Sequence, residues 1–537
     1  MHTEHTPENG KITAGAHVSF WTDSVPAIRF QPLRQNLQTD VVIVGGGISG
    51  VMTAYCLSQA GKRVALVEDG YIGSGETGRT TAHLANALDD RFYELERIFG
   101  ENISKLAGQS HGSAIDFIEQ TVRDEQIDCD FRRLPGYLFP HPSDDEKNIE
   151  KEFGAALRAG LPVEKTDHIP GLLVQPGAPG LVFHNQAQFH PLKYLRGMCD
   201  AIIRLGGQIY TETRASEIGG SGIVTADGIK VLADFVVVAT NAPVTSRFLL
   251  PMKQFPFRTY AIGALVEKGR LSQALWWDTG DRDADSDNPP YHYVRTESYN
   301  ETHDLLICGG EDHPTGLADA GNLPEEKRYD LLAAWARQYF PIGDVVYRWS
   351  GQVMEPADSL GYIGHSPGIT PDNVFLVSGD SGHGMTHGTI AGMLLTDLIT
   401  DKENPWEKMY SPSRFNFIGK GAAWIKEWLT GFVQYLTHNP SDKDASKLAA
   451  LRKDEGTIVK IHGDTYGAYR DGHNRLLLVS AKCTHMGCTV KWNNDEKTWD
   501  CPCHGGRYTF TGEVLNGPPN RPLDYHRESD PDFFKHK

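Results

Sequence analysis

Four residues in the last part of this chain combine two thiols with two imidazoles in a narrow window. Cys483 and His485 form a C-x-H group, and after fifteen intervening residues Cys501 and His504 form a C-x-x-H group. Thiolate and imidazole are the ligands that hold zinc and iron–sulfur clusters in proteins. Four of the eight cysteines lie within residues 483–503, whereas the other four are scattered. This distribution indicates a metal site and not the disulfide framework of a secreted scaffold.

A second group with a chemical role lies near the start of the chain. The unbroken apolar run 41–44 is typical of a strand buried on both faces, and Gly45-Gly46-Gly47-Ile48-Ser49-Gly50 follows it directly. A helical pattern then runs to Ala60, and a second apolar strand ends at Glu68. In such a unit the three spaced glycines allow the turn, the approach of a pyrophosphate and close helix–strand packing.

This unit predicts a dinucleotide site. Its binding residues are expected to be Gly45, Gly47, Ser49 and Gly50 at the helix start, where free N–H groups face the phosphates. Glu68 is placed to accept hydrogen bonds from an adenosine ribose, and an acid at this position argues against NADP. The stretch does not by itself decide between NAD and FAD.

Composition sets limits on the remaining possibilities. A chain of 537 residues has room for two to four domains. The net charge of −17 disfavours nucleic acid and an anionic membrane surface as main partners. There is no apolar run of the ~18 residues that a membrane-spanning helix needs, so no integral membrane segment is expected. The polar first fifteen residues lack an apolar region and a twin arginine, which favours a cytoplasmic location.

Apolar spacing predicts the elements that position these groups. Helical spacing favours helices at 92–99, 115–122 and 422–436, whereas alternating or continuous apolar runs favour strands at 134–140, 208–213, 257–262 and 305–310.

Three further blocks resemble the D-amino-acid oxidase and sarcosine oxidase superfamily of flavin-dependent enzymes. They are a loop of small residues at 72–84, a buried strand ending at Ala239-Thr240-Asn241-Ala242, and a strand, glycine turn and helix start at 374–386. They follow one another in the family's order, and the resemblance implies FAD as the cofactor. The contacts that it implies with FAD come from Gly78, Arg79, Thr80, Thr81, Ala215, Thr240, Gly382, His383, Gly384, Met385 and Thr386.

Three residues are candidates for the reaction site. His83 stands where some family members, such as dimethylglycine dehydrogenase, carry a histidine bonded covalently to the flavin; a hydrogen-bonding or packing histidine is the alternative. Tyr291, Tyr293 and Arg295 alternate, so they share one face of any strand there. If that face lines a pocket, Arg295 could hold a substrate carboxylate, the alternative being a surface salt bridge. Tyr260 is a further candidate, with core packing as its alternative.

The cysteine–histidine group closely resembles the Rieske domain. The resemblance implies a [2Fe–2S] cluster in which one iron takes the thiolates of Cys483 and Cys501 and the other takes the imidazoles of His485 and His504. A zinc site built from the same residues is the alternative.

Neighbouring residues of the Rieske-like segment resemble the cytochrome bc and b6f type. Cys488 and Cys503 match the disulfide that ties the two cluster loops together in those proteins. Gly506 stands where they carry a serine that donates to a cluster sulfur, whereas Tyr508 is retained. Because a lost donor disfavours the reduced cluster, we predict a reduction potential below that of the respiratory proteins.

The predicted fold is an α/β Rossmann-like FAD-binding domain with an α+β substrate domain, plus a C-terminal all-β Rieske domain. The expected boundaries are 1–37 for an N-terminal lead-in; 38–110, 181–245 and 346–405 for the FAD-binding domain; 111–180 and 246–345 for the substrate domain; 406–450 for a connector helix and linker; and 451–537 for the Rieske domain.

Together the two resemblances imply an FAD-dependent dehydrogenase that oxidises a small amine or amino-acid-like substrate. Hydride would pass to the flavin, and electrons would then pass singly to the cluster and on to an acceptor that the sequence does not identify. Three alternatives stay open. They are an oxidase that uses O2 and keeps the cluster as a structural or regulatory part, a reductase or monooxygenase in which the cluster feeds the flavin, and a redox protein that is not an enzyme.

Overall fold

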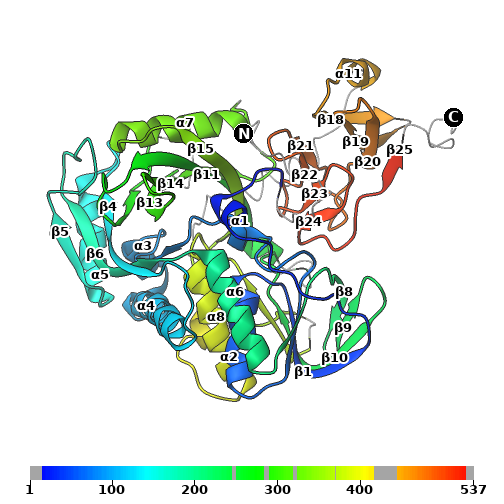
Figure 1. Cartoon of the computed structure of the whole chain (residues 1–537), viewed down its shortest axis with the longest axis horizontal. Coiled ribbons are helices and arrows are strands. Elements are labelled where there is room, and N and C mark those ends of the chain that lie inside the picture. The colour runs from blue at the N-terminus through cyan, green and yellow to red at the C-terminus, as the bar shows by residue number, and fades with distance from the viewer. Residues whose placement is uncertain are drawn as a thin grey trace.

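The structure is a computed structural model that describes residues 15–242, 244, 250–283, 290–317, 323–368, 371–415, 444–461 and 463–527. Two large sheets with their helices form most of the molecule, and a small all-β domain built from the last part of the chain lies against them (Figure 1). Across the described residues, every helix is too short or too polar to cross a membrane.

The first sheet has eight strands, and its main order is β16-β17-β10-β1-β2-β7, with β9 joined to β10 and β8 to β9. The strands are β1 Leu37–Val44, β2 Val64–Val67, β7 Gln208–Tyr210, β8 Ala215–Gly219, β9 Gly222–Thr225, β10 Lys230–Val238, β16 Tyr362–His365 and β17 Val374–Ser378. The neighbours β17, β10, β1, β2 and β7 run parallel. Their carboxyl ends therefore meet at one edge, where open α/β sheets bind ligands.

Three helices, α2 Ile48–Gln59, α6 Pro191–Arg204 and α8 Gly384–Ile399, lie side by side over this sheet (Figure 1). Helix α2 carries no charged residue and is buried from Gly50 to Ser58, as a helix between a sheet and two other helices must be. The other helices are α1 Phe20–Ser24, α3 Phe92–Phe99, α4 Glu101–Asp124, α5 Glu146–Arg158, α7 Glu325–Tyr339, α9 Glu407–Tyr410 and α11 Asp444–Ala450, with short 3-10 turns η2 Glu76–Gly78 and η3 Pro251–Lys253.

The second sheet has nine strands in the order β15-β11-β14-β13-β12-β4-β6-β3, with β5 paired to β6. The strands are β3 His83–Leu84, β4 Arg132–Phe139, β5 Val163–Thr166, β6 Gly180–Gln188, β11 Gln254–Glu267, β12 Leu275–Asp278, β13 Tyr293–Ser298, β14 His303–Pro314 and β15 Val345–Pro356. Helix α7 packs on β11 and β14, where it closes a separate apolar core.

The last part of the chain forms two antiparallel sheets of four strands each. One contains β18 Glu455–Ile461, β19 Asp464–Arg470, β20 Leu476–Ser480 and β25 Tyr525–Arg527, and the other contains β21 Lys491–Asn493, β22 Thr498–Asp500, β23 Arg507–Thr509 and β24 Val514–Asn516. Trp499 and Tyr508 are fully buried in the core of this domain, together with Cys483 and Cys501.

The fold class and most of the expected elements are confirmed, whereas the sheet membership of three segments differs from the expected boundaries. Strands β3, β6 and β15 fall in ranges that we assigned to the FAD-binding domain, yet all three belong to the nine-stranded sheet, in which β3 pairs with β6. The reason is long-range pairing: β6 pairs with β4 and β15 pairs with β11, and local sequence does not encode those partners. The helix expected at 422–436 lies outside the described residues.

Candidate functional site

The turn between β1 and α2 forms the cradle that the glycine spacing predicts. Gly45 has a φ of +115°, and a Cβ placed on it would lie 2.3 Å from the carbonyl oxygen of Ala239 at the end of β10. A Cβ on Gly50 would lie 1.9 Å from the carbonyl oxygen of Gly45. Two strands and the helix start therefore approach so closely that only glycine fits, which leaves the backbone N–H groups open to a pyrophosphate.

Glu68 ends β2 beside this turn. Its carboxylate accepts hydrogen bonds from the backbone N–H groups of Gly46, at 2.6 Å, and Gly70, at 2.8 Å. These bonds fix the acid at the carboxyl edge of the sheet, where a ribose of a bound dinucleotide lies.

A cavity of about 560 Å³ begins at this turn and continues between the two sheets. Most of the residues expected to bind FAD line it, namely Gly45, Gly47, Ser49, Glu68, Arg79, Thr80, Thr81, Ala215, Thr240, Gly382, His383, Gly384 and Met385. Gly50, Gly78 and Thr386 do not line it. Gly50 lies beneath the turn, Gly78 packs on the carbonyl of Gly73, and the Thr386 hydroxyl contacts His111 of α4 at 2.7 Å. The shape and lining of the cavity suit FAD.

Replacing Gly45 with alanine is expected to abolish most FAD binding. Alanine would combine an unfavourable positive φ with the clash against Ala239. Gly61→Ala is the matched control, because Gly61 also has a positive φ, of +80°, but a Cβ there meets nothing within 4 Å. The flavin-to-protein absorbance ratio of the purified variants measures the effect. Full flavin content in Gly45→Ala would contradict this account of the cradle.

His83 lies in the wall of the cavity. Its Nε2 lies 3.1 Å from the carbonyl oxygen of Val294, and its Nδ1 lies 3.1 Å from the hydroxyl of Thr81. Burial, with the charge of Arg295 nearby, lowers the pKa of His83 to about 3, so the ring is neutral. With both ring nitrogens engaged, this geometry favours the hydrogen-bonding alternative over covalent attachment.

The two other candidates for the reaction site lie behind the cavity wall. Arg295 is fully buried and donates to the carbonyl oxygens of Ala82 and Phe189 at 2.9 and 3.0 Å, and to Glu297. Tyr260 contacts His313 through its hydroxyl at 2.9 Å. Neither residue lines the cavity, so this placement does not support the expectation that they contact substrate. The alternating pattern correctly placed Tyr291 and Tyr293 on one face, and both line the cavity. Arg295, the third residue of that pattern, is instead covered by the loop at Thr81.

The side chain of Arg79 also points elsewhere than expected. The residue lines the cavity, but its guanidinium group donates to the carbonyl oxygen of Ser350 at 2.7 Å and to Glu496 of the C-terminal domain at 2.8 Å. Arg79 therefore links the loop of small residues at 72–84 to the C-terminal all-β domain.

The four expected cluster ligands lie on two adjacent loops of the all-β domain. Cys483 and Cys501 are 4% and 1% exposed, and their mutual hydrogen bond lowers the pKa of Cys483 to about 7 while it raises the pKa of Cys501. The rings of His485 and His504 lie 4.9 Å apart. Two paired sulfurs and two paired imidazoles match the ligand set of a Rieske cluster.

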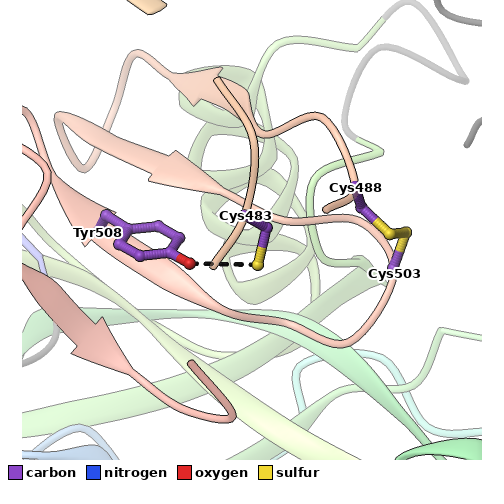
Figure 2. The surroundings of a disulfide bond; sticks show 4 residues. All are labelled: Cys483, Cys488, Cys503 and Tyr508. Carbon is purple, nitrogen blue, oxygen red and sulfur yellow. Dashed lines mark hydrogen bonds between the residues drawn. A yellow bond between two sulfur atoms is a disulfide. The ribbon is translucent and has the colours of Figure 1, made fainter. Parts of the chain in front are cut away.

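A disulfide between Cys488 and Cys503 joins the two loops, as the resemblance implied (Figure 2). The sulfurs of Cys488, Cys501 and Cys503 lie within 4.8 Å of one another, which by distance alone would suit a metal ion. Two of these sulfurs are bonded to each other and cannot act as thiolates, so this trio is not the metal site.

The hydroxyl of Tyr508 lies 3.2 Å from the Sγ of Cys483 and points towards it in Figure 2. At the neighbouring Gly506, a Cβ would lie 2.7 Å from Cδ of Pro519. A serine at that position would thus displace the Pro519 loop, which explains why glycine is present.

Replacing Tyr508 with phenylalanine is expected to lower the cluster's reduction potential by about 40–60 mV, the equivalent of one hydrogen bond for a one-electron couple. A cluster-bound Cys483 thiolate can only accept, so the Tyr508 hydroxyl would donate to it, and this donation would favour the reduced cluster, which carries the more negative charge. Tyr469→Phe is the control, because the Tyr469 hydroxyl bonds Asp454 in the same domain, away from the sulfurs. An EPR-monitored redox titration compares the three proteins. An unchanged potential in Tyr508→Phe would show that this bond does not tune the cluster.

The ligand loop that carries Cys501 and His504 lies against the wall of the flavin cavity. The Gly505 carbonyl oxygen, next to His504, accepts a hydrogen bond from Nε2 of Gln352 at 3.1 Å, and Gln352 lines the cavity. The segment from Val514 to Gly517, with Pro519 and Asn520, forms part of the cavity wall. Asn516 donates to Glu76 of the flavin side at 2.9 Å. One cavity is thus bounded by both halves of the molecule.

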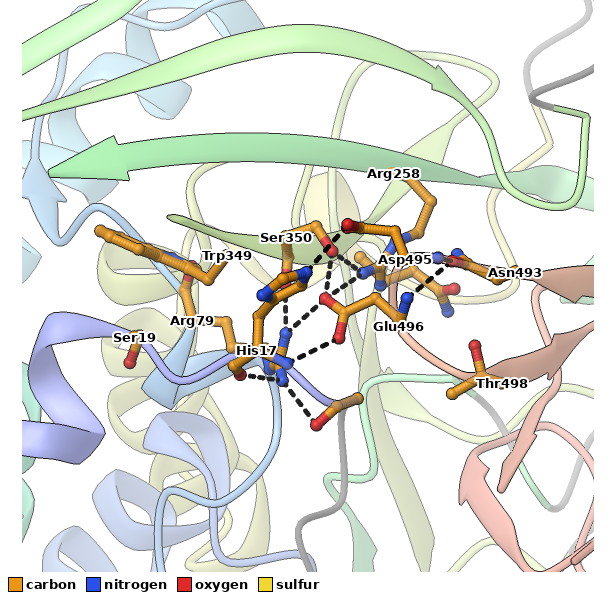
Figure 3. Close-up of polar contacts among 12 residues, drawn as sticks. His17, Ser19, Arg79, Arg258, Trp349, Ser350, Asn493, Asp495, Glu496 and Thr498 are labelled. Atoms are coloured by element: carbon orange, nitrogen blue, oxygen red, sulfur yellow. Dashed lines mark hydrogen bonds and ion pairs between the residues drawn. The ribbon is translucent and has the colours of Figure 1, made fainter. Parts of the chain in front are cut away.

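A buried charge cluster stabilises the interface between the all-β domain and the rest of the molecule (Figure 3). Oε1 of Glu496, 2% exposed in the all-β domain, lies 2.8 Å from Arg79 and 3.4 Å from Arg258, and it also accepts from Ser350. Oε2 accepts from the backbone N–H of His17 at 3.1 Å. Burial alone would raise the pKa of Glu496, but the charges of Arg79, His17 and Arg258 hold it well below its ordinary value. Sequence reasoning missed Glu496 and Arg258, because no local pattern marks two partners so far apart in the chain.

The fold and the two sites define a flavin-dependent oxidoreductase joined to an iron–sulfur domain. Comparison with known proteins identifies the family to which each part of the chain is similar. Residues 40–398 match the family model described as FAD dependent oxidoreductase, and residues 443–527 match the Rieske [2Fe-2S] domain. The chain therefore belongs to the FAD dependent oxidoreductase family and carries a Rieske domain.

Individual relatives agree with this assignment. The chain is 32% identical to the putative Rieske 2Fe-2S iron-sulfur protein YhfW of Bacillus subtilis over 96% of its length and 98% of the relative's. It is 25% identical to gamma-glutamylputrescine oxidoreductase of Escherichia coli, over 78% of this chain and 94% of that protein. The crystal structure of glycine oxidase from Geobacillus kaustophilus superposes with a TM-score of 0.57 at 20% identity, covering 71% of this chain and all of that one. This last likeness concerns the fold.

Proposed function

We propose that this protein is a dehydrogenase that oxidises a small amine-like substrate and passes the electrons within the molecule to its own cluster. When bound, FAD accepts a hydride from the C–H bond beside a substrate nitrogen, and the [2Fe–2S] cluster takes electrons one at a time. The amine class is supported by the relative that is named for gamma-glutamylputrescine and by the fold shared with glycine oxidase.

The observation that carries the proposal is the shared wall between the two cofactor sites. Pro519 lines the flavin cavity and lies against Gly506, where a Cβ would be 3.5 Å from the Sγ of Cys483. On the same ligand loop, the neighbouring Gly505 accepts a hydrogen bond from Gln352 of the cavity wall. The ligand loop that carries Cys501 and His504 thus reaches the cavity wall within two residues of His504, an arrangement that a purely structural domain would not require. The cytoplasmic location and the external electron acceptor stay predictions.

The residues of the reaction end hold the substrate and exclude water. Tyr291 donates through its hydroxyl to Oδ2 of Asp89 at 2.6 Å, and the backbone N–H of Asp89 donates to Nε2 of His383 at 2.9 Å. Because that nitrogen of His383 accepts a hydrogen bond, its ring is held at the start of α8 with a fixed orientation. Tyr293, whose hydroxyl lies 2.6 Å from Thr259, closes the opposite wall.

The test is anaerobic rapid mixing of the protein, loaded with both cofactors, with a panel of amines and amino acids. Flavin absorbance and the EPR signal of the reduced cluster are followed together. We expect flavin bleaching followed by the cluster signal within one turnover. Bleaching with a cluster that stays oxidised would overturn the intramolecular transfer and favour an oxidase.

A further inference from the structure

The cavity wall is strongly acidic. Its charged lining comprises the acids Glu68, Asp69, Glu76, Asp89, Glu217, Asp312, Glu355 and Asp380, and the arginines Arg79 and Arg214. Neither arginine is placed to bind a substrate anion. Arg79 is engaged with Glu496 and three carbonyl oxygens, and Arg214 adjoins Ala215, which is expected to contact FAD. Within this lining no guanidinium or ammonium group serves a substrate carboxylate, so the reaction end disfavours amino acids.

Two of these acids face the reaction end. A Cβ on Gly382, at the turn before α8, would lie 2.9 Å from Oδ2 of Asp89, so Asp89 borders the flavin end of the cavity. Asp312 lies on β14 and its Oδ1 is buried, yet this oxygen accepts no hydrogen bond from any described residue. A buried carboxylate oxygen without a donor implies a donor that arrives with a ligand.

Aromatic side chains line the cavity together with these two acids. The rings of Tyr291 and Tyr293 lie 5.4 Å apart with a tilt of 42°. Trp277 lines the same cavity at 3% exposure, and its Nε1–H has no acceptor among the described residues. Aromatic faces attract cations, whereas they offer nothing to a carboxylate. The Trp277 N–H group, which lacks an acceptor, is a second and independent indication that this part of the cavity wall contacts a bound molecule.

We propose that the substrate carries a second, cationic nitrogen: it is an aliphatic diamine or polyamine. Asp312 holds the distal ammonium beside Tyr291 and Tyr293, while the amine to be oxidised lies at the flavin end near Asp89 and His383. This inference rests on the proposed amine dehydrogenase function and names the substrate class of that same site.

Three four-carbon amines test it, because they share a primary amine and differ only at the far end of the chain. They are 1,4-diaminobutane, 1-aminobutane and 4-aminobutanoate, which end in ammonium, methyl and carboxylate. Binding to the oxidised protein is followed by the perturbation of the flavin spectrum, and reduction by anaerobic bleaching. We expect the diamine to bind about 10- to 100-fold more tightly than 1-aminobutane, as expected for a hydrogen bond to a charged group, and the carboxylate to bind most weakly.

In Asp312→Asn, the ratio of the affinity for the diamine to the affinity for 1-aminobutane is expected to fall by about 10-fold or more. The substitution removes the negative charge of the side chain but keeps its shape. Asp304→Asn is the control, because Asp304 lies on the same strand, outside the cavity lining. Its preference should match that of the unmodified protein.

The possible outcomes separate this inference from the proposed function. Diamine binding that depends on Asp312 but causes no bleaching would support the substrate class and overturn the dehydrogenase function. Bleaching in which 4-aminobutanoate or 1-aminobutane equals the diamine would leave that function intact and overturn this inference. If none of the three perturbs the flavin spectrum of the unmodified protein, the inference is also overturned.

Discussion

Replacing Glu496 with glutamine is expected to loosen the attachment of the Rieske domain to the flavin side. The change leaves the buried guanidinium groups of Arg79 and Arg258 without their shared negative partner. Breaking a buried ion pair by removing one charge costs about 3–5 kcal/mol, because the other charge stays desolvated. The ligand loop that carries Cys501 and His504 should then leave the cavity wall for part of the time, and cluster reduction should slow accordingly.

Two measurements on Glu496→Gln separate loss of docking from loss of folding. Visible circular dichroism of the cluster reports an intact Rieske domain, and anaerobic stopped-flow mixing reports the rate of cluster reduction after flavin bleaching. Glu513→Gln is the matched control, since Glu513 is exposed on the same domain. A docked, normally reduced cluster in Glu496→Gln would show that the buried charges do not hold the interface.

The same charge cluster determines how far the pH can fall before the Rieske domain detaches from the rest of the molecule. The pKa of Glu496 is depressed in the folded protein below its ordinary value of 4.5. Its contribution to stability is therefore complete above about pH 4.5 and is lost only as the pH falls further, through the folded pKa. Docking should accordingly survive mild acidification.

Local patterns predicted much of this molecule, since the determining residues are neighbours in sequence. The turn from Gly45 to Gly50, the acid at Glu68 and the ligand spacing from Cys483 to His504 each specify their geometry within a few residues. Such motifs combine strand, turn and helix requirements that agree with one another, which is why they can be recognised without a structure.

Other features depend on contacts that no local pattern encodes. The ion pair between Arg79 and Glu496 joins residues separated by 417 positions, and Asp312 enters the cavity only because β14 pairs with β11 and β13. Arg295 illustrates the reverse case. Strand alternation placed it correctly relative to Tyr293, but a loop covers it and converts an expected substrate contact into a buried structural group.

Removing a cluster ligand is expected to have the largest effect on turnover. In Cys501→Ser the cluster should not assemble, because one thiolate of the set is lost. Substrate should still bleach the flavin at nearly the normal rate, since the cavity residues at the reaction end, such as Asp89, Tyr293 and His383, lie outside the Rieske domain. Turnover with a one-electron acceptor such as ferricenium should fall by at least about 100-fold, because the one-electron carrier is missing.

Met486→Ala provides the control for this change, since Met486 lies in the same ligand loop, is 42% exposed and is not a ligand. Iron content and EPR establish which variants carry the cluster, and anaerobic bleaching and steady-state turnover are then compared in the same preparations. If Cys501→Ser keeps full turnover with the one-electron acceptor, the cluster does not lie on the electron path. The shared wall around Pro519 and Gln352 would then serve to hold the two domains together, and the oxidase alternative would account for the flavin site.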